Sequence, residues 1–321
     1  MTGRVLIGDI GGTRSRFGVT NSGQAALEVY DVVKLANDDF ASSDAALKTY
    51  LQTIPAVPDH ALLAVSGPVK DRAVKLTNRG WSFSAQALKA QYGFKNVTLV
   101  NDFMAMARAV PVLDKDRFET VLDGEADPAA PVLVAGPGTG LGMATLLPLG
   151  SGKWKVLGGE GGHSAFAPRS REDVKLGQIL HSRYGFVSYE LVTSGSGLAA
   201  VHWAMCKLYS EPYTEIPAEA VSQAARDGDL ICERVCAFRA RALMGFLGDM
   251  VLANGALGGV VLAGGATASL LPWLEREQAQ TYYLDRGPRS AYIANVPVRR
   301  MRGEFIPLVG AAALYNDEIG A

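Results

Sequence analysis

Short apolar runs alternate with amphipathic segments over the first hundred residues of the chain. Apolar positions three or four residues apart predict helices over Ala45–Gln52 and Ser84–Tyr92, and the short β-branched runs around them predict strands. Strands that alternate with helices are typical of an α/β fold with a mixed sheet. The four predicted strands are Val5–Asp9, Arg16–Thr20, Ala61–Ser66 and Val97–Asn101.

A second α/β pattern is expected after the proline- and aspartate-containing stretch Asp123–Pro131. Its longest predicted helix covers Ile231–Asn254, and Gly255 would cap the C-terminal end. A last helix is predicted over Gly310–Tyr315, and we expect it to return to the first unit. The predicted strands of the second unit are Val132–Ala135, Gly142–Leu147, Trp154–Gly158 and Val260–Ala263.

The length of the chain, 321 residues, exceeds what a single hydrophobic core usually fills. We therefore predict two α/β domains, with mixed sheets flanked by helices and a ligand-binding cleft between the domains. The predicted small domain comprises residues 1–110 plus 303–321, and the predicted large domain comprises residues 111–302.

The two units begin with similar sequences. Leu6–Thr13 and Val132–Thr139 each consist of an apolar strand that runs into a glycine turn closed by threonine, which indicates an internal repeat. Glycines at a strand end let backbone N–H groups approach an anion, and threonine adds a hydroxyl donor. Gly11–Thr13 and Gly138–Gly140 are therefore candidate phosphate sites, although ordinary hairpin turns have the same composition. Neither turn matches the Walker or the dinucleotide-binding pattern.

Asp9 is an acid at the end of an otherwise apolar strand. An unpaired carboxylate is costly in such a buried position. A magnesium ion carried by ATP, bound directly or through its water, would offset that cost. A carboxylate that caps the following turn through backbone N–H groups explains the residue equally well, so both interpretations stay open.

Charge and cysteine content narrow the class of partner. Acidic and basic residues are interspersed and give a formal net charge of -1, so no basic field would draw the chain onto nucleic acid or a membrane. A small-molecule partner is expected instead. Three cysteines without a CxxC pair support neither a disulfide framework nor a structural zinc site, and they suit a reducing compartment. They are Cys206, Cys232 and Cys236.

Two apolar stretches could be mistaken for targeting or membrane segments. The N-terminal run is interrupted by Asp9 and is too short for a signal peptide, so we expect a cytoplasmic protein. Val251–Trp273 is free of charges over a length that could cross a bilayer. Asn254, five glycines and Pro272 divide it into a helix end, a short strand and a turn, so we expect no membrane span.

Five motifs occur in the order and spacing seen in the bacterial glucokinase family, which the chain resembles from its first strand to its last helix. That family belongs to the hexokinase, actin and heat-shock ATPase fold group, so the resemblance implies a two-domain actin-like ATPase fold of the ribonuclease H-like type. It also implies ATP-dependent phosphorylation of glucose at the 6-hydroxyl, with Mg²⁺ carried by the nucleotide, and a homodimer. The motifs are Gly8–Thr13, Asn101–Phe103, Gly138–Gly142, Gly158–His163 and Gly264–Gly265.

The resemblance assigns nucleotide contacts to both glycine turns and to a third glycine pair. That pair matches the family's adenosine-contacting turn, although a simple strand-to-helix turn has the same sequence. Asp9 is the implied metal contact. The implied nucleotide contacts are Gly8, Asp9, Ile10, Gly11, Gly12, Thr13, Gly138, Thr139, Gly140, Gly264 and Gly265.

Asp102 follows a predicted strand at its C-terminal end, where open α/β sheets place ligands. Phosphoryl transfer to a sugar needs a group that takes the proton of the attacking hydroxyl, and the resemblance assigns this catalytic role to Asp102. From the residues alone, an N-cap for a helix that begins at Phe103 is the stronger interpretation, because aspartate is a preferred cap residue.

Sugars are recognised by planar polar groups that bridge neighbouring hydroxyls. The resemblance names six such residues, of which Asn78 lies in a segment near the family's sugar site. Taken singly, a histidine that stabilises a turn or a glutamate on a solvated helix face needs no ligand. The implied glucose contacts are Asn78, Asn101, Asp102, Glu160, His163 and Glu190.

Two residues depart from the family pattern: Arg14 stands where relatives often carry asparagine, and Ala165 where some carry aspartate. Ser164–Arg183 contains no cysteine, which separates the chain from the related repressor-and-kinase group with its zinc motif. Three alternatives stay open: a kinase for another hexose, a non-catalytic sugar-sensing regulator, and an actin-like or chaperone ATPase. A regulator would need a helix-turn-helix unit, and the first strand already begins at Val5.

Overall fold

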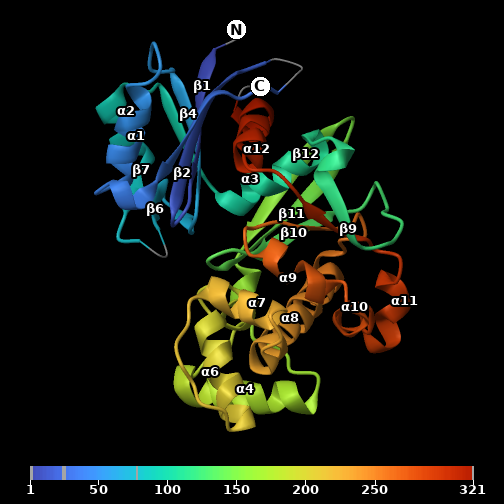
Figure 1. The fold of residues 1–321 in the computed structure, drawn as a ribbon. Coiled ribbons are helices and arrows are strands. Elements are labelled where there is room, and N and C mark those ends of the chain that lie inside the picture. Colours follow the sequence, from blue (N-terminus) through green and yellow to red (C-terminus); the bar gives the residue numbers. More distant parts are fainter. Residues whose placement is uncertain (1–2, 24–26, 77–78, 320–321) are drawn as a thin grey trace. The chain divides into compact units, whose positions relative to one another are not determined.

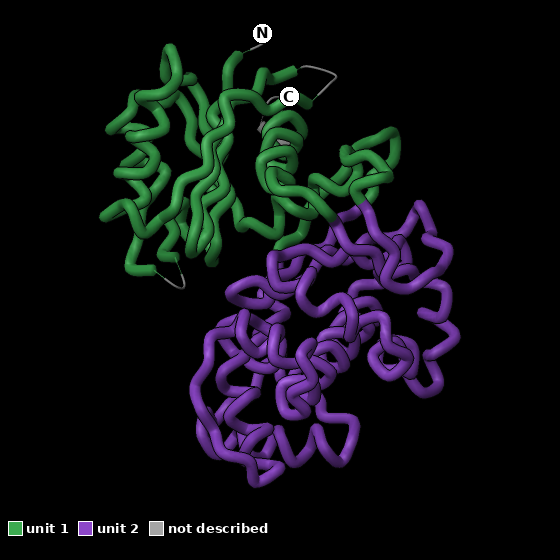
Figure 2. The backbone as a smooth tube through the Cα atoms, in the orientation of Figure 1, with its two compact units in different colours: residues 1–117, 148–158, 302–321 green, residues 118–147, 159–301 purple. Residues whose placement is uncertain are grey.

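The computed structural model describes residues 3–23, 27–76 and 79–319. The chain forms two compact units, which Figure 2 draws in separate colours. Both units contain strands and helices, as the sequence predicts. Unit 1 comprises Met1–Arg117, Pro148–Gly158 and Arg302–Ala321, and unit 2 comprises Phe118–Leu147 and Gly159–Met301.

Unit 1 is built on a mixed sheet with the strand order β3-β2-β1-β4-β8. Strand β1 pairs antiparallel with β2 and parallel with β4, and β4 pairs parallel with β8. The central strands are apolar and almost completely buried, which fixes their register. Their bounds are β1 Arg4–Ile10, β2 Arg14–Asn21, β3 Tyr30–Ala36, β4 His60–Val65 and β8 Asn96–Asn101; β5 Val69–Lys70, β6 Ala73–Lys75 and β7 Ser82–Ser84 form a small separate sheet.

Helices cover both faces of this sheet (Figure 1). On one side, α1 and α2 share a core with the strands, to which Leu47, Tyr50 and Leu88 contribute. On the other side, α12 packs against α3, β1 and β4, so the C-terminal helix completes the unit that the first strand begins. The bounds are α1 Ser43–Leu51, α2 Ala85–Tyr92, α3 Asp102–Ala109 and α12 Ile306–Leu314.

A second mixed sheet has the strand order β12-β11-β10-β13-β14-β9. Strand β10 pairs antiparallel with β11 and parallel with β13, and β13 pairs parallel with β14. The order β12-β11-β10-β13-β14 matches β3-β2-β1-β4-β8, so the internal repeat seen in the sequence extends to the topology. The bounds are β9 Phe118–Leu122, β10 Val132–Pro137, β11 Leu141–Gly150, β12 Lys153–Gly159, β13 Val260–Leu262 and β14 Val298–Met301.

The core of unit 2 surrounds the 25-residue helix α8, whose side chains are buried along most of its length. Helices α5, α6, α7, α9 and α10 all pack against it. It ends at Gly255, whose φ of 62° and N–H bond to the Val251 oxygen form the predicted glycine cap. The bounds are α4 Arg171–Tyr184, α5 Tyr189–Thr193, α6 Leu198–Tyr209, α7 Ala218–Arg226, α8 Leu230–Asn254, α9 Thr267–Leu274, α10 Glu277–Leu284 and α11 Ser290–Ile293.

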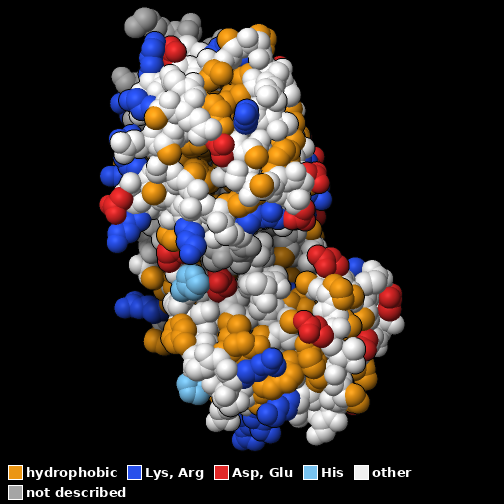
Figure 3. Space-filling view, turned by 90° about the vertical axis from the view of Figure 1, so that its left-hand side faces the viewer, with side chains coloured by type: hydrophobic (Ala, Val, Ile, Leu, Met, Phe, Trp, Pro, Cys, Tyr) orange, Lys and Arg blue, Asp and Glu red, His pale blue; other side chains and the backbone are white. Residues whose placement is uncertain are grey.

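The uncharged stretch Val251–Trp273 holds the end of α8, strand β13 and the Gly264–Gly265 turn, as predicted, and it also holds most of α9, which was not predicted. In the described part of the chain, no helix has both the length and the apolar character needed to cross a membrane. Basic and acidic side chains both occur on the face shown in Figure 3, in keeping with the nearly neutral net charge.

Candidate active site

The first glycine turn, Gly11–Thr13, connects β1 to β2 and is held by side chains of unit 1. Asn37 Nδ2 donates to the carbonyl oxygens of Gly11 at 2.8 Å and Gly12 at 3.3 Å. Arg79 Nε donates to the Gly12 oxygen at 3.0 Å. Because Asn37 is completely buried, its amide is fixed in place. The carbonyl side of the first turn is therefore bound by an amide and a guanidinium.

The N–H groups of the first turn face away from these partners. In a planar trans peptide, the C=O of one residue and the N–H of the next point in opposite directions. Since Asn37 binds the oxygens of Gly11 and Gly12, the N–H groups of Gly12 and Thr13 point the other way. Neither N–H has an acceptor among the described residues, and Thr13 is exposed. The turn can therefore offer an anion two backbone N–H groups and a hydroxyl.

Asp9 lies in β1, two residues before the first turn, and its side chain is almost completely buried. Arg16 stands opposite it in β2, and Arg16 Nη1 donates to Asp9 Oδ2 at 2.7 Å. Burial raises the pKa of Asp9, while the Arg16 guanidinium acts in the opposite direction. The Asp9 carboxylate is therefore held by an ion pair with Arg16 and not by the turn cap that was one of its two open interpretations. The antiparallel register is the sequence signal that could have identified Arg16.

Gly8 and Ile10 contribute to the packing of β1. A Cβ on Gly8 would come within 2.5 Å of Leu63 Cδ2 and 3.1 Å of Phe17 Cδ1, so no side chain fits there. The Ile10 side chain is buried in the core of unit 1. A nucleotide contact by either residue would therefore have to use the backbone.

Asn101 and Asp102 lie where β8 ends and α3 begins. Asn101 is the N-cap: its Oδ1 accepts from the Phe103 N–H at 2.9 Å, and its Nδ2 donates to the Gly67 oxygen at 3.3 Å. Asp102 is the first residue of α3, and its Oδ1 also accepts from the Phe103 N–H at 2.9 Å. The interpretation of Asp102 as the cap of a helix that begins at Phe103 is therefore wrong, because Asn101 has that position.

The second glycine turn, Gly138–Gly140, connects β10 to β11 and is held by backbone groups of unit 2. The Gly195 N–H donates to the carbonyl oxygen of Gly138 at 2.9 Å, and the Ser196 N–H donates to the carbonyl oxygen of Thr139 at 3.1 Å. By the same peptide geometry, the N–H groups of Thr139 and Gly140 point away from this segment. Neither has an acceptor among the described residues, and Thr139 is exposed. The second turn therefore offers the same groups as the first.

Glu190 lies in the first turn of α5. Its carboxylate lies between the second glycine turn and the predicted sugar-binding residue His163. Its Oε2 accepts from the Leu141 N–H, immediately after the second turn, at 2.8 Å. Its Oε1 lies 3.8 Å from His163 Nε2. A Cβ on Gly140 would come within 2.5 Å of Glu190 Oε2, so the glycine permits this close approach. Glu190 is thus not a residue of a solvated helix face.

Glu160 immediately precedes a short 3-10 helix, Gly161–His163, and His163 is the last residue of that helix. The backbone N–H of His163 donates to the backbone carbonyl oxygen of Glu160 at 3.0 Å. A Cβ on Gly162 would lie 2.0 Å from the Leu141 oxygen, so only glycine lets this segment lie so close to β11. The Glu160 side chain is exposed and has no hydrogen-bond partner among the described residues. Both side chains are therefore accessible to a polar ligand.

Gly264 and Gly265 lie between β13 and α9, beside the end of β10. Gly264 has a φ of +89°, and a Cβ there would come within 2.6 Å of the Pro137 oxygen. The Ala266 N–H donates to that oxygen at 3.1 Å. This backbone conformation and close approach both require glycine at position 264.

Unit 2 thus places the second turn beside the Gly264–Gly265 turn and also beside Glu190, which lies next to His163. Unit 1 places the first turn at the end of β1, and Asn101 with Asp102 at the end of β8. Asn78 lies outside the described residues. Within those residues, no three His, Cys, Asp or Glu side chains are grouped to hold a metal ion. Sequence reasoning missed the supporting residues Arg16, Asn37, Arg79, Gly195 and Ser196.

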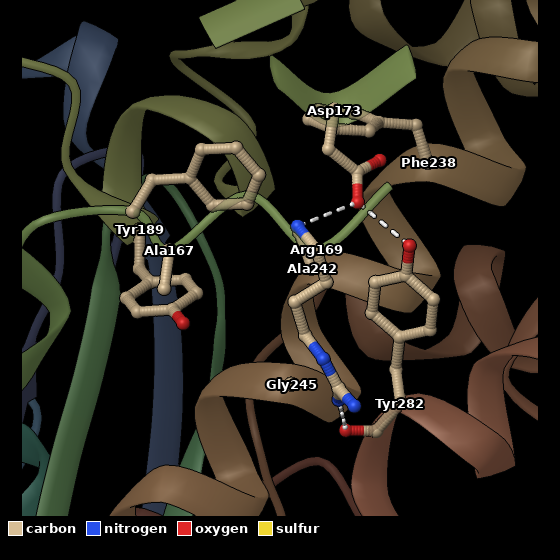
Figure 4. Close-up of a pocket in the computed structure, with 9 residues that line it drawn as sticks. Ala167, Arg169, Asp173, Tyr189, Phe238, Ala242, Gly245 and Tyr282 are labelled. Atoms are coloured by element: carbon tan, nitrogen blue, oxygen red, sulfur yellow. Dashed lines mark hydrogen bonds between the residues drawn. The ribbon is translucent and has the colours of Figure 1, made fainter. Parts of the chain in front are cut away.

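A small pocket in unit 2 contains none of the predicted site residues (Figure 4). Its polar groups bind each other: Tyr282 Oη donates to Asp173 Oδ2 at 2.6 Å, and Arg169 Nη1 donates to the backbone carbonyl oxygen of Tyr282 at 2.7 Å. The Arg169 N–H also donates to Asp173 Oδ2, at 3.2 Å. These contacts tie the start of α4 to α10, so the pocket has a structural explanation.

Comparison with known proteins identifies one family. The sequence model of the family described as Glucokinase matches residues 6–318. The chain is 38% identical to a glucokinase of Chromohalobacter salexigens, over 99% of this chain and 100% of the relative. A glucokinase structure from an Antarctic psychrotroph has a TM-score of 0.84 and 34% identity, with 98% of each chain covered. A glucokinase of Balamuthia mandrillaris, crystallised with glucose, has a TM-score of 0.81 at 20% identity, with 97% of this chain and 93% of that chain covered.

Proposed function

Because this chain belongs to the glucokinase family of hexose kinases, we propose that it transfers the terminal phosphoryl group of ATP to the 6-hydroxyl of glucose. The products are glucose 6-phosphate and ADP. Family membership also identifies the fold as the actin-like ATPase fold. The observation that carries the proposal is the pair of glycine turns, each with two outward N–H groups and a threonine hydroxyl.

The two turns bind the phosphates of ATP in this proposal. A triphosphate needs several fixed donors, because its charge would otherwise have to be solvated by water. The turns supply the N–H groups of Gly12, Thr13, Thr139 and Gly140, held in place through the carbonyl oxygens on the opposite side. Gly264 and Gly265 contact the adenosine, since they lie beside the second turn.

Asp9 is the residue proposed to hold Mg²⁺, through water or directly. Arg16 binds Asp9 Oδ2, while Asp9 Oδ1 has no hydrogen-bond partner among the described residues. One carboxylate oxygen with nucleotide phosphates and waters is a usual environment for this ion, so the residue fits. The ion neutralises phosphate charge when it is bound.

Asp102 is the proposed general base. It accepts the proton of the 6-hydroxyl as that oxygen attacks the γ-phosphorus and ADP leaves. Its place in the first turn of α3 suits a carboxylate, because the positive end of the helix dipole stabilises negative charge there. Asn101, Glu160, His163 and Glu190 are the proposed glucose contacts, with Asn78 as a further one.

The test is release of ADP from Mg-ATP, measured by a coupled assay with glucose, mannose, fructose or N-acetylglucosamine. We expect glucose-dependent release with glucose 6-phosphate as product. Release that depends on another hexose alone would identify a kinase for that sugar. Sugar-independent release would indicate an ATPase, and sugar binding without release would indicate a sensor.

We also propose that the enzyme acts in the cytoplasm as a homodimer. The three buried cysteines, none of which forms a disulfide, support a reducing compartment, and family resemblance supports the dimer. Light scattering that gives the mass of a single chain at working concentrations would contradict the dimer.

A further inference from the structure

Arg239 is a buried cation in the middle of α8. Its side chain is 1% exposed, and no carboxylate lies within ion-pair distance of it among the described residues. Its Nε has no hydrogen-bond partner there either. Burial lowers the pKa of Arg239 to about 10, so the guanidinium is still charged at neutral pH. A buried charge without a counterion is costly, which calls for an explanation.

The Arg239 guanidinium binds backbone carbonyl oxygens at the end of α5 and immediately after it. Arg239 Nη2 donates to the carbonyl oxygens of Thr193 at 2.7 Å and Ser194 at 3.1 Å. The two following residues, Gly195 and Ser196, donate their N–H groups to the carbonyl oxygens of the second glycine turn. A single short segment therefore lies between the buried guanidinium and the proposed phosphate site.

The contacts form a continuous chain of peptide groups. The Ser194 oxygen accepts from Arg239, and the N–H of the same peptide, on Gly195, donates to the Gly138 oxygen at 2.9 Å. The N–H of the next peptide in the chain, on Thr139, has no acceptor among the described residues. Hydrogen bonds in series polarise one another, so a cation at one end strengthens the donor at the other.

We propose that Arg239 is a positioning residue for the nucleotide, which acts on the phosphates through the segment 193–196 and the second turn without touching them. The inference rests on the proposed function, in which the second turn contacts phosphate. Held this way, the turn has its N–H groups fixed and polarised before ATP arrives. The nucleotide phosphates supply the negative charge that Arg239 lacks in its own surroundings.

Arg241 provides a matched control on the same helix. It is largely buried, but Arg241 Nη2 donates to Glu172 Oε2 at 2.8 Å and lies 3.5 Å from Asp173 Oδ1. It therefore has ordinary carboxylate partners, and among the described residues none of its hydrogen bonds or ion pairs goes to a glycine turn or to the segment 193–196. Replacement of Arg241 by methionine removes a cation from α8 without affecting the second turn.

The experiment compares Arg239→Met, Arg239→Lys and Arg241→Met by the KM for ATP, the KM for glucose and the melting temperature. We expect Arg239→Met to raise the KM for ATP about tenfold and to leave the KM for glucose near the wild-type value. Arg239→Lys should recover part of the loss, because an ammonium can still donate to a carbonyl oxygen. Arg241→Met should change the melting temperature without changing the KM for ATP.

An unchanged KM for ATP in Arg239→Met would overturn the inference. So would a parallel rise in both KM values that follows the melting temperature, since that is the effect of a structural residue. If Arg239→Met does not fold, Arg239→Lys decides: its KM for ATP must exceed that of the wild type while its KM for glucose does not.

Amide NMR signals separate this inference from the proposed function. In the full-length wild type, AMPPNP should shift the N–H signals of Thr139 and Gly140. No such shift would show that the second turn does not contact phosphate, so both proposals would fail at that site. A wild-type shift that Arg239→Met or Arg239→Lys leaves unchanged would defeat the role of Arg239 alone.

Discussion

The two glycine turns present the same groups but are supported in different ways. Side chains of Asn37 and Arg79 bind the carbonyl oxygens of the first turn, whereas backbone N–H groups of Gly195 and Ser196 bind those of the second. Most of the first support can be removed by one substitution, because Asn37 alone binds the carbonyl oxygens of both Gly11 and Gly12. The second depends on the path of the backbone, and so on the buried side chains that fix that path. One chemical requirement is therefore met by two kinds of structure.

The surroundings of the turns differ as well. The carboxylate near the first turn, Asp9, is buried and paired with Arg16, while the carboxylate beside the second, Glu190, joins the turn to His163. In unit 1, strand β8 leads into Asp102, whereas its topological counterpart β14 ends at Met301. The repeat thus duplicates phosphate binding in this account, while the base for the reaction occurs only in unit 1.

The largest expected effect on activity concerns Asp102, the proposed base that occurs only in unit 1. Asp102→Asn should lower kcat by about 10² to 10⁴, because the general base is lost while the side-chain shape is kept. Glucose affinity, measured by calorimetry, should change much less than kcat. The exposed Asp114→Asn is the control. Near-normal turnover of folded Asp102→Asn would show that the base is wrongly assigned.

Asn37→Asp should have the next largest effect. It replaces the donor that holds the Gly11 and Gly12 oxygens with an acceptor, which should cost about 1–3 kcal/mol of stability and raise the KM for ATP about tenfold. Chemical denaturation and initial rates measure the two quantities. Asn21→Asp, at the far end of β2, keeps its acceptor for Tyr30 and should leave the KM for ATP unchanged. Equal effects of the two variants would contradict the account of the first turn.

Glu190→Gln should affect the sugar more than the nucleotide. The amide oxygen can still accept from the Leu141 N–H, but the charge that strengthens bonds from sugar hydroxyls is lost, so we expect the KM for glucose to rise about fivefold. The exposed Glu219→Gln should change neither constant. A change confined to the KM for ATP would assign Glu190 to the second turn alone.

The smallest effect concerns stability and pH. Burial raises the pKa of Asp9, so its contribution to stability is greatest below the usual aspartate pKa and falls as pH rises through the folded value. Removal of the cation in Arg16→Met should raise that pKa further. We expect the variant to lose about 1 kcal/mol more relative to wild type near pH 8 than near pH 5. A pH-independent difference, or the same trend in the exposed Arg14→Met, would contradict this.

Much of the fold follows from sequence periodicity. Ile231–Asn254 predicts nearly all of α8, and Val5–Asp9 predicts β1 within a residue at each end. The predicted start of the last helix, Gly310, is four residues later than the observed start at Ile306, and Pro307 lies in the first turn, where proline is compatible with a helix. A strong apolar pattern shows where a helix or strand lies. The exact first and last residues depend on local capping contacts, which the pattern does not show.

The supports of the candidate site were less predictable. Arg16 could have been found, because hairpin register places it opposite Asp9. Arg79 could not, since it reaches the Gly12 oxygen from 67 positions further along the chain. Gly195 and Arg239 likewise have no local pattern that links them to the second turn. Contacts between distant segments arise from tertiary packing, which periodicity does not encode.

Phosphoryl transfer to the 6-hydroxyl can be tested directly by comparing glucose with 6-deoxyglucose as the sugar in the ADP-release assay. The two sugars differ only in the hydroxyl that is proposed to attack the γ-phosphate. We expect rapid ADP release with glucose. With 6-deoxyglucose we expect competitive inhibition against glucose and no release above the rate without sugar. Equal release with both sugars would contradict phosphoryl transfer to the 6-hydroxyl.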